Sequence, residues 1–284
     1  MLARRIGGVN CNERMAYLKT PEEVKIIQAG GEILGRILAK LAKMIKPGVN
    51  AKEIDDEAER LIKKAGGLPS FKGYQGKKND PPFPTAVCFC INEDLVHGIA
   101  NKEKVVKKGD IVSIDIGMEY PVGRGKGNGG RGLFTDTSIT VAAGKVTKAT
   151  KKLLEVTKQA LEIGIEKCVV GNTIADIGKA IQNYVEQFGF GVVRDLVGHG
   201  VGHAVHEEPR VPNYYDKNLE NWKLEPGVVI AIEPMVTMGD YKIGVADDGW
   251  SISTLDKSLC AHFEHTVIIT EGKPRVVTRR PNER

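Results

Sequence analysis

Apolar positions recur at helical spacing in four stretches of the chain. The first stretch begins at the capping box Thr20-Pro21-Glu22-Glu23 and ends before Pro47-Gly48. The second ends at Gly66-Gly67, where two glycines stop a helix. Two further helices are predicted near residues 148–166 and 174–187.

Short apolar runs predict strands from about residue 84 to 141 and again through the C-terminal third. Four of these runs carry or adjoin a carboxylate, at Asp115, Asp136, Glu233 and Glu264, and His199 lies in a glycine-rich turn. A carboxylate on a buried strand is costly unless something pairs with it. Four acids and one imidazole around one core therefore predict a cation site, for two ions rather than one. Carboxylate oxygens with one histidine favour Mn, Fe(II), Co or Zn.

The order helix, helix, strands occurs twice along the chain. Residues 109–115 resemble residues 227–233, and residues 95–99 resemble residues 197–201, in the same order. These matches predict two related halves, roughly 20–141 and 147–270, within a single domain that spans 1–284. A site built from equivalent strands of both halves would lie at their junction, where ligand sites are often found.

Composition is that of an ordinary globular protein. The 284 residues are 41% hydrophobic and 27% charged, enough for a substantial core. A net charge of +5 is explained by ordinary surface lysine and arginine, with nucleic-acid binding as the minority interpretation. Five cysteines without a CxxC pair argue against a disulfide framework or a zinc finger. With no secretory signal and no membrane-length apolar run, we expect a cytoplasmic protein.

Five ordered motifs resemble those of the methionine aminopeptidases. They are Ser-Ile-Asp115-Ile-Gly, Thr-Asp136-Thr-Ser, Gly-His199-Gly-Val-Gly-His, Ile-Glu233-Pro-Met and Phe-Glu264-His-Thr. The resemblance runs from about residue 21 to 270 and is closest to the short, type I form. It implies an α+β pita-bread fold, with two αβ halves about a pseudo-twofold axis, a central curved antiparallel sheet and helices on the outer face. It also implies a monomer that removes the N-terminal methionine from nascent proteins and peptides, favouring a small second residue.

The resemblance assigns roles to the five motif residues. Asp115 would hold one metal ion, Asp136 and Glu264 would bridge two ions, and His199 and Glu233 would hold the second. A pair of divalent cations polarises a peptide carbonyl and lowers the pKa of a water molecule between them. Glu233 is the candidate to move a proton from that water to the leaving amine.

The same resemblance adds two histidines and a pocket. His206 would donate to the scissile carbonyl or developing oxyanion, and His97 would contact the scissile amide. An apolar pocket for the methionine side chain is expected from Phe83, Cys88, Val205 and Trp250. Phe83 and Val205 stand where the family is expected to have Tyr and Phe. Each pocket residue is equally explained as plain core.

The main departure from the family lies between Asp115 and Asp136. The extra segment, about residues 120–133, is rich in glycine and basic residues and predicts a mobile, extended hairpin. It is explained either as a tolerated surface insertion or as a basic finger that makes transient contact with ribosomal RNA. The basic tail, residues 275–284, is expected to be a solvated terminus.

Two other functions are weighed against the peptidase. One is a non-catalytic pita-bread relative that binds RNA or protein; such relatives lose metal ligands, which this chain retains. The other is an X-Pro exopeptidase of the same fold, which the surroundings of Trp250 argue against.

Overall fold

The computed structural model describes residues 17–76, 81–123 and 131–283. Within these ranges, four α-helices form close to their predicted bounds: α2 (Pro21–Met44), α3 (Ala51–Lys64), α4 (Lys148–Glu166) and α5 (Ile174–Glu186). Two short 3-10 helices, η2 (Lys217–Leu219) and η3 (Pro281–Glu283), follow later in the chain. No helix in the described ranges combines the length and apolar character needed to cross a membrane.

Local side-chain capping explains where the helices begin. At α2 the Thr20 hydroxyl accepts the backbone N–H of Glu23 at 3.3 Å, and the Glu23 carboxylate accepts the backbone N–H of Thr20 at 2.9 Å. Asn50 and Thr173 make the same reciprocal arrangement at α3 and α5. Each cap satisfies backbone donors that have no partner within the helix, so the starts could be predicted from four-residue patterns.

The strands form antiparallel sheets. The longest pair is β4 (Ile111–Tyr120) with β5 (Leu133–Ala142), which remain in register over ten residues. The other strands are β1 (Leu68–Pro69), β2 (Val87–Ile91), β3 (Asp94–Val96), β6 (Gly191–Val192), β7 (Gly198–Gly200), β8 (Glu207–Val211), β9 (Val229–Ile232), β10 (Met235–Thr237), β11 (Ile243–Val245), β12 (Ile252–Thr254), β13 (Cys260–His262), β14 (His265–Ile268) and β15 (Arg275–Val276). One sheet joins β2 and β1 to the edge of β4 opposite β5, and another has the order β15-β14-β9-β7-β8.

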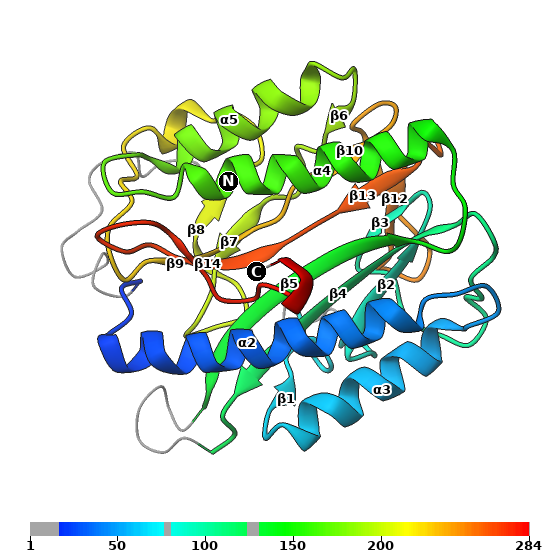
Figure 1. Cartoon of the computed structure of the whole chain (residues 1–284), viewed down its shortest axis with the longest axis horizontal. Helices are drawn as coiled ribbons and strands as arrows, with labels where there is room; N and C mark the ends of the chain where they lie inside the picture. The colour runs from blue at the N-terminus through cyan, green and yellow to red at the C-terminus, as the bar shows by residue number, and fades with distance from the viewer. Residues whose placement is uncertain (1–16, 77–80, 124–130, 284) are drawn as a thin grey trace.

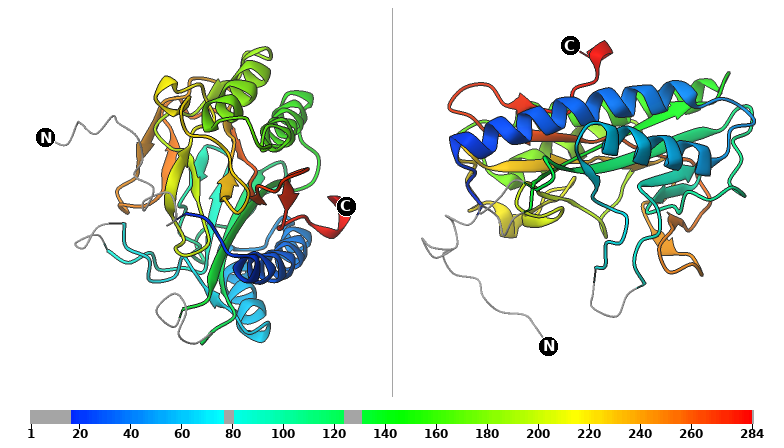
Figure 2. Two further views of the ribbon diagram at one scale, coloured as in Figure 1. Left: turned by 90° about the vertical axis from the view of Figure 1, so that its left-hand side faces the viewer. Right: turned by 90° about the horizontal axis from the view of Figure 1, so that it is seen from below.

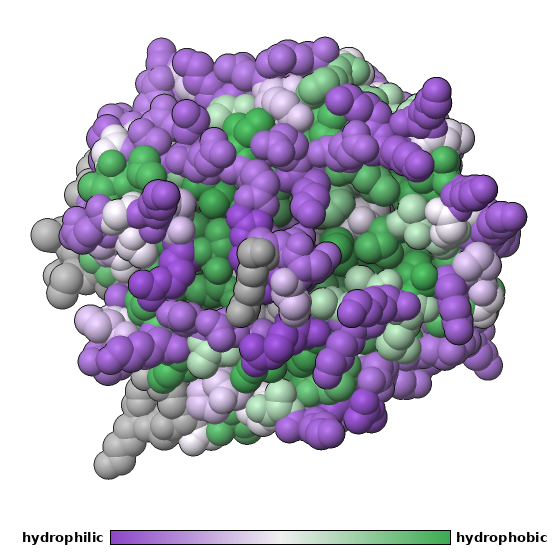
Figure 3. Space-filling model, viewed as in Figure 1, coloured by the Kyte–Doolittle hydropathy of each residue, from purple (hydrophilic) through white to green (hydrophobic). Residues whose placement is uncertain are grey.

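The helices lie on one side of the strand layer, as the two turned views show (Figures 1 and 2). Helices α2 and α3 pack on β2 and β4 through Leu34, Leu38 and Ile54. Helices α4 and α5 pack on β9 and β14 through a second core that includes Leu153 and Ile181. The outer face carries hydrophilic side chains along the helices, with apolar groups between them (Figure 3). We interpret the two helix pairs as the outer layers of the two proposed halves.

The C-terminal segment differs from the expectation of a solvated tail. Arg280 is 1% exposed and Thr278 is fully buried, so the chain after β15 returns to the core. Arginine is rarely buried in this way without partners, and here it pairs with Glu283 and donates to the backbone carbonyl of Ser138. In the predicted hairpin, β4 ends at Tyr120 and β5 begins at Leu133, while residues 124–130 lie outside the described residues.

Candidate metal centre and substrate pocket

The register of β4 against β5 places two carboxylates on one face. Asp115 lies opposite Ser138, and Gly117 lies opposite Asp136. Residues two apart along a strand point to the same side, so Asp115 and Asp136 are diagonal neighbours on one face of the sheet. Asp136 is 3% exposed and Asp115 is half-buried, so Asp136 faces the interior and Asp115 lies beside it at the edge of the same cavity.

The remaining three motif residues approach Asp115 and Asp136 from the sheet β15-β14-β9-β7-β8. His199 lies in β7 and pairs in register with Ala231 of β9, and Glu233 follows the end of β9. Glu264 lies between β13 and β14, where its backbone N–H donates to the Ser138 carbonyl of β5 at 3.1 Å. This hydrogen bond joins the strand of Asp136 to the segment that carries Glu264.

The structure brings the five predicted residues together. Three groups of possible ligand atoms each lie within 4.8 Å of one another: Asp115 with Asp136 and Glu264; His199 with Glu233 and Glu264; and Asp136 with His199 and His206. Asp136, Glu264 and His199 each belong to two groups. Carboxylates shared between neighbouring groups are what a pair of bridged ions requires.

The donor set fits divalent cations. Asp115 Oδ1, Asp136 Oδ1 and Glu264 Oε1 are buried without a hydrogen-bond partner, which is rare for a carboxylate oxygen unless a cation binds it. Burial, reinforced by neighbouring carboxylates, raises the pKa of Asp136 and Glu264 well above the usual range. Burial also raises the pKa of Asp115 to about 6. The fold holds these acids together at an electrostatic cost that a bound cation would remove.

His199 is oriented as a ligand. Its Nδ1 lies 2.9 Å from the carbonyl oxygen of Gly200, so Nδ1–H donates there and Nε2 is the nitrogen left to bind a metal ion. Nε2 lies 3.9 Å from Asp136 Oδ2 and 3.7 Å from Glu233 Oε1. Nε2 of His199 therefore faces the carboxylate groups.

Both predicted catalytic histidines line the same cavity. The ring of His206 lies edge-on to that of His199, with centroids 4.4 Å apart. Surrounding protein lowers the pKa of His206 to about 3, with a further contribution from His199, although water in the cavity still reaches the ring. Burial also lowers the pKa of His97, which adopts a left-handed backbone φ of 56°. Both imidazoles are therefore neutral at pH 7 and keep one N–H to donate.

A cavity of about 330 Å³ adjoins the acids. Phe83, Cys88 and Trp250 line it, with Phe83 edge-on to Trp250 at 5.2 Å between centroids. Val205 packs in the same apolar cluster but is not among the lining residues. Further apolar walls come from Phe71, Val96, Leu196 and Met235. Acids at one part of the cavity and aromatic rings at another suit a substrate with a polar reacting group beside an apolar side chain.

Two residues in the site were missed from the sequence. His262, 1% exposed, has Nε2 3.3 Å from Glu233 Oε2. Its position two residues before Glu264 was the available signal, because alternate strand positions share a face. Tyr74 lines the cavity edge-on to His206 at 5.0 Å between centroids. Nothing in the surrounding sequence distinguished Tyr74 from an ordinary loop tyrosine.

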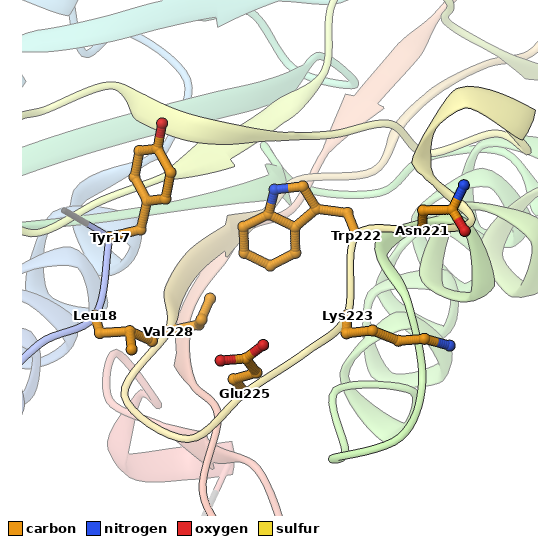
Figure 4. A pocket seen from close by; sticks show the side chains of 7 residues that line it. All are labelled: Tyr17, Leu18, Asn221, Trp222, Lys223, Glu225 and Val228. Atoms are coloured by element: carbon orange, nitrogen blue, oxygen red, sulfur yellow. The ribbon is translucent and has the colours of Figure 1, made fainter. Parts of the chain in front are cut away.

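A second, smaller cavity of about 40 Å³ lies between the start of the described chain and residues 221–228. In Figure 4, Tyr17 and Trp222 lie along its upper side, with Val228 and Glu225 below them. Among its lining residues Glu225 is the one carboxylate, and there is no histidine or cysteine beside it. It offers no ligand set comparable to that of the larger cavity.

Comparison with known proteins agrees with this geometry. The model of metallopeptidase family M24 matches residues 25–271. Methionine aminopeptidase of Clostridium acetobutylicum is 42% identical over 264 residues, 93% of this chain and 99% of that protein. Methionine aminopeptidase 1 of Bacillus subtilis is 44% identical over 265 residues, 93% of this chain and all of that protein.

Solved structures give the same result for the fold. Methionine aminopeptidase from Thermotoga maritima superimposes with a TM-score of 0.84 at 38% identity, covering 93% of this chain and 99% of that one. Prolidase from Pyrococcus furiosus, at 23% identity, has a TM-score of 0.70 and shares the fold alone, with 94% of this chain matching 66% of it. The expected pita-bread α+β fold is confirmed.

Proposed function

This chain belongs to metallopeptidase family M24, and we propose that it removes the N-terminal methionine from peptides and nascent chains. The observation that carries the proposal is the set of overlapping carboxylate and histidine groups beside an apolar cavity. The relatives named as methionine aminopeptidases align over more than nine-tenths of the chain, which supports the same reaction here.

The ligand groups suggest how two ions would be held. Asp115 would bind one ion, Asp136 and Glu264 would bridge, and His199 and Glu233 would bind the other. When bound, such a pair polarises the scissile carbonyl and lowers the pKa of a water molecule. Mn, Fe(II), Co and Zn all suit carboxylates with one imidazole, so the identity of the ions is for experiment to decide.

The protein's own groups would handle the protons. Glu233 has Oε1 toward His199 and Oε2 toward His262, so its carboxylate sits between a ligand and a buried imidazole. Glu233 would take a proton from the attacking water and pass it to the leaving amine.

His206 and His97 would stabilise charge that develops on the substrate. Both line the cavity, and as neutral imidazoles each would have one N–H to donate. An N–H aimed at a developing oxyanion favours the transition state over the ground state. Phe83, Cys88 and Trp250, with Val205 behind them, would take the unbranched thioether side chain.

A metal titration tests the function. Metal-stripped protein should release methionine from Met-Ala-Ser when Mn, Fe(II), Co or Zn is restored, and should leave Ala-Pro uncut. Glu233→Gln should lower kcat by about 10²- to 10⁴-fold, while Glu220→Gln on the exposed surface should have no effect. A folded protein that is inactive with every metal would favour the binding relative, and preferential cleavage of Ala-Pro would favour the X-Pro exopeptidase.

Action on nascent chains would place the protein in the cytoplasm near the ribosome, and its family suggests a monomer. We keep a transient ribosome contact through the basic hairpin 120–133 as part of the proposal; most of its tip, residues 124–130, lies outside the described residues. If salt-sensitive co-sedimentation with ribosomes persists after residues 121–132 are deleted, the hairpin does not make the ribosome contact.

A further inference from the structure

The C-terminal segment places a buried arginine beneath the metal-ligand strands. Arg280 is 1% exposed and is the largest of the fully buried side chains. Its Nε lies 2.7 Å from Glu283 Oε2, and Glu283 is itself only 4% exposed in its side chain. A buried ion pair of this kind is weak evidence of added stability, because desolvation offsets much of its attraction.

The guanidinium group contacts the backbone of the strand that carries Asp136. Arg280 Nη1 donates to the carbonyl oxygen of Ser138 at 3.0 Å. The same oxygen accepts the backbone N–H of Glu264 at 3.1 Å. The Ser138 carbonyl oxygen thus accepts hydrogen bonds from both Arg280 and Glu264, and Glu264 is one of the two residues expected to bridge the ions.

Further hydrogen bonds make this junction rigid. The Thr137 hydroxyl donates to the Glu264 carbonyl at 2.8 Å, and the Thr266 hydroxyl donates to the Asp136 carbonyl at 2.8 Å. The Thr266 N–H donates in turn to the Thr278 hydroxyl, two residues before Arg280. The segment 278–283 therefore ties together the strand of Asp136 and the strand after Glu264.

His265 completes the cluster on the side away from the cavity. It alternates with Glu264 along the chain, and its Nδ1 lies 2.9 Å from the Thr278 hydroxyl. Its Nε2 lies 3.3 Å from Arg280 Nη2 and 3.6 Å from Glu283 Oε2. These contacts fill the space behind the ligands with groups that fix Arg280.

We propose that Arg280, held by Glu283, is a positioning residue of the metal centre. It fixes Asp136 and Glu264 relative to each other from behind, and so sets the affinity for divalent cations. It touches neither ion nor substrate. The inference rests on the two-ion site proposed above. It adds a residue, Arg280, that lies outside the five motifs and influences how tightly that site binds metal.

Metal affinity measured by calorimetry tests the inference without reference to activity. Metal-stripped Arg280→Met and Glu283→Gln proteins should bind Mn²⁺ about 10- to 100-fold more weakly than the unmodified protein, as expected when a group that orients ligands is lost. Arg279→Gln is the matched control: Arg279 is adjacent but pairs with Glu162 of α4, so Mn²⁺ affinity should not change. Electron paramagnetic resonance of the Mn²⁺-loaded proteins should show altered coupling between the ions in the first two variants only.

The outcomes separate this inference from the proposed function. An unmodified protein that binds neither Mn²⁺ nor Fe(II), Co or Zn would overturn the two-ion site and this inference with it. Tight binding by the unmodified protein, with unchanged affinity in folded Arg280→Met, would overturn the positioning role alone. If Arg280→Met does not fold, Glu283→Gln decides, because it keeps the arginine and removes the charge that holds it.

Discussion

The residue on which the proposed oxyanion contact depends, His206, lies in a turn held by a distant lysine. Glu207 Oε2 accepts the backbone N–H groups of His203 and Ala204, each at 3.1 Å. Glu207 Oε1 pairs with Lys19, whose ammonium group is fully buried and also donates to the Tyr17 carbonyl at 2.9 Å. A carboxylate that satisfies two turn donors and one lysine fixes the backbone on either side of His206.

Replacing Lys19 should lower kcat but should leave the affinity for metal ions unchanged. In Lys19→Met the Glu207 carboxylate loses its buried partner, so the turn relaxes and His206 moves. We expect kcat for Met-Ala-Ser to fall about 10- to 100-fold, since a displacement of about 1 Å is enough for this. Mn²⁺ affinity should stay unchanged, because Lys19 contacts none of the five carboxylate and histidine ligands.

Steady-state kinetics and calorimetry on the same preparation check this prediction. Lys52→Met is the matched control, since Lys52 forms an exposed pair with Asp56 on α3 and should leave kcat unaltered. An unchanged kcat in folded Lys19→Met would show that the turn holds His206 without the lysine.

At the scale of elements, two glycines of α2 leave a shallow depression, the hollow, against which residues 277–279 of the C-terminal segment pack. A Cβ atom on Gly35 would lie 2.6 Å from the Thr278 carbonyl oxygen and 2.9 Å from that of Arg279. One on Gly31 would lie 2.7 Å from a methyl group of Val277. Without a side chain at these two positions, the helix allows the backbone of residues 277–279 to approach closely.

Filling the hollow should destabilise the protein, although alanine favours helices over glycine. Gly35→Ala gains about 1 kcal/mol of helix propensity. It should nevertheless lose net stability, because displacing a packed backbone costs about 1–3 kcal/mol and disturbs the Arg280 contacts as well. Urea unfolding should show a lower midpoint, and Mn²⁺ affinity should fall. Gly30→Ala on the same helix meets only Tyr120 at 3.3 Å and should be close to neutral; equal effects of both changes would contradict this account.

The contrast between α2 and the tail explains which features the sequence predicts. Helix starts depend on residues three or four apart, such as Thr20 and Glu23, so they can be recognised locally. The burial of Arg280 depends on glycines of α2 and a carbonyl of β5, more than a hundred residues away. A basic tail with no apolar pattern gives no local sign of such partners, and it was wrongly expected to be solvated.

Across the whole molecule, the carboxylates that gather from two sheets were predictable because each interrupts or adjoins an apolar strand. Asp115 and Glu264 stand out in the sequence for that reason, and the motif resemblance then assigned each of them a role in metal binding. Tyr74 and Val205 show where this reasoning ends: which side chains line a cavity depends on how loops pack over it. Tyr74 lines the cavity, whereas Val205 lies behind the wall.

The same cluster makes metal-free protein sensitive to pH. Asp136 and Glu264 have raised pKa values when folded, whereas in the unfolded chain both lose their protons near pH 4. Above about pH 4 the folded state therefore binds more protons than the unfolded chain, and its stability falls as pH rises toward the folded pKa values. The histidines with lowered pKa values, His97, His206 and His265, oppose this only below about pH 6.5, where the unfolded chain gains protons.

As pH rises from about 4 toward the folded pKa values of Asp136 and Glu264, these two carboxyl groups should lower the stability of metal-stripped protein by up to about 1.4 kcal/mol per pH unit for each extra proton held in the folded state. Urea unfolding in chelator at several pH values measures this slope. Asp136→Asn should reduce it, because one titrating carboxyl is gone, while buried cysteines contribute equally to both proteins. Saturating Mn²⁺ should flatten the slope of the unmodified protein, since the cation replaces the protons. Identical slopes for the metal-free protein and Asp136→Asn would mean that Asp136 is already ionised without metal, and that the carboxylates do not depend on a cation to lie together.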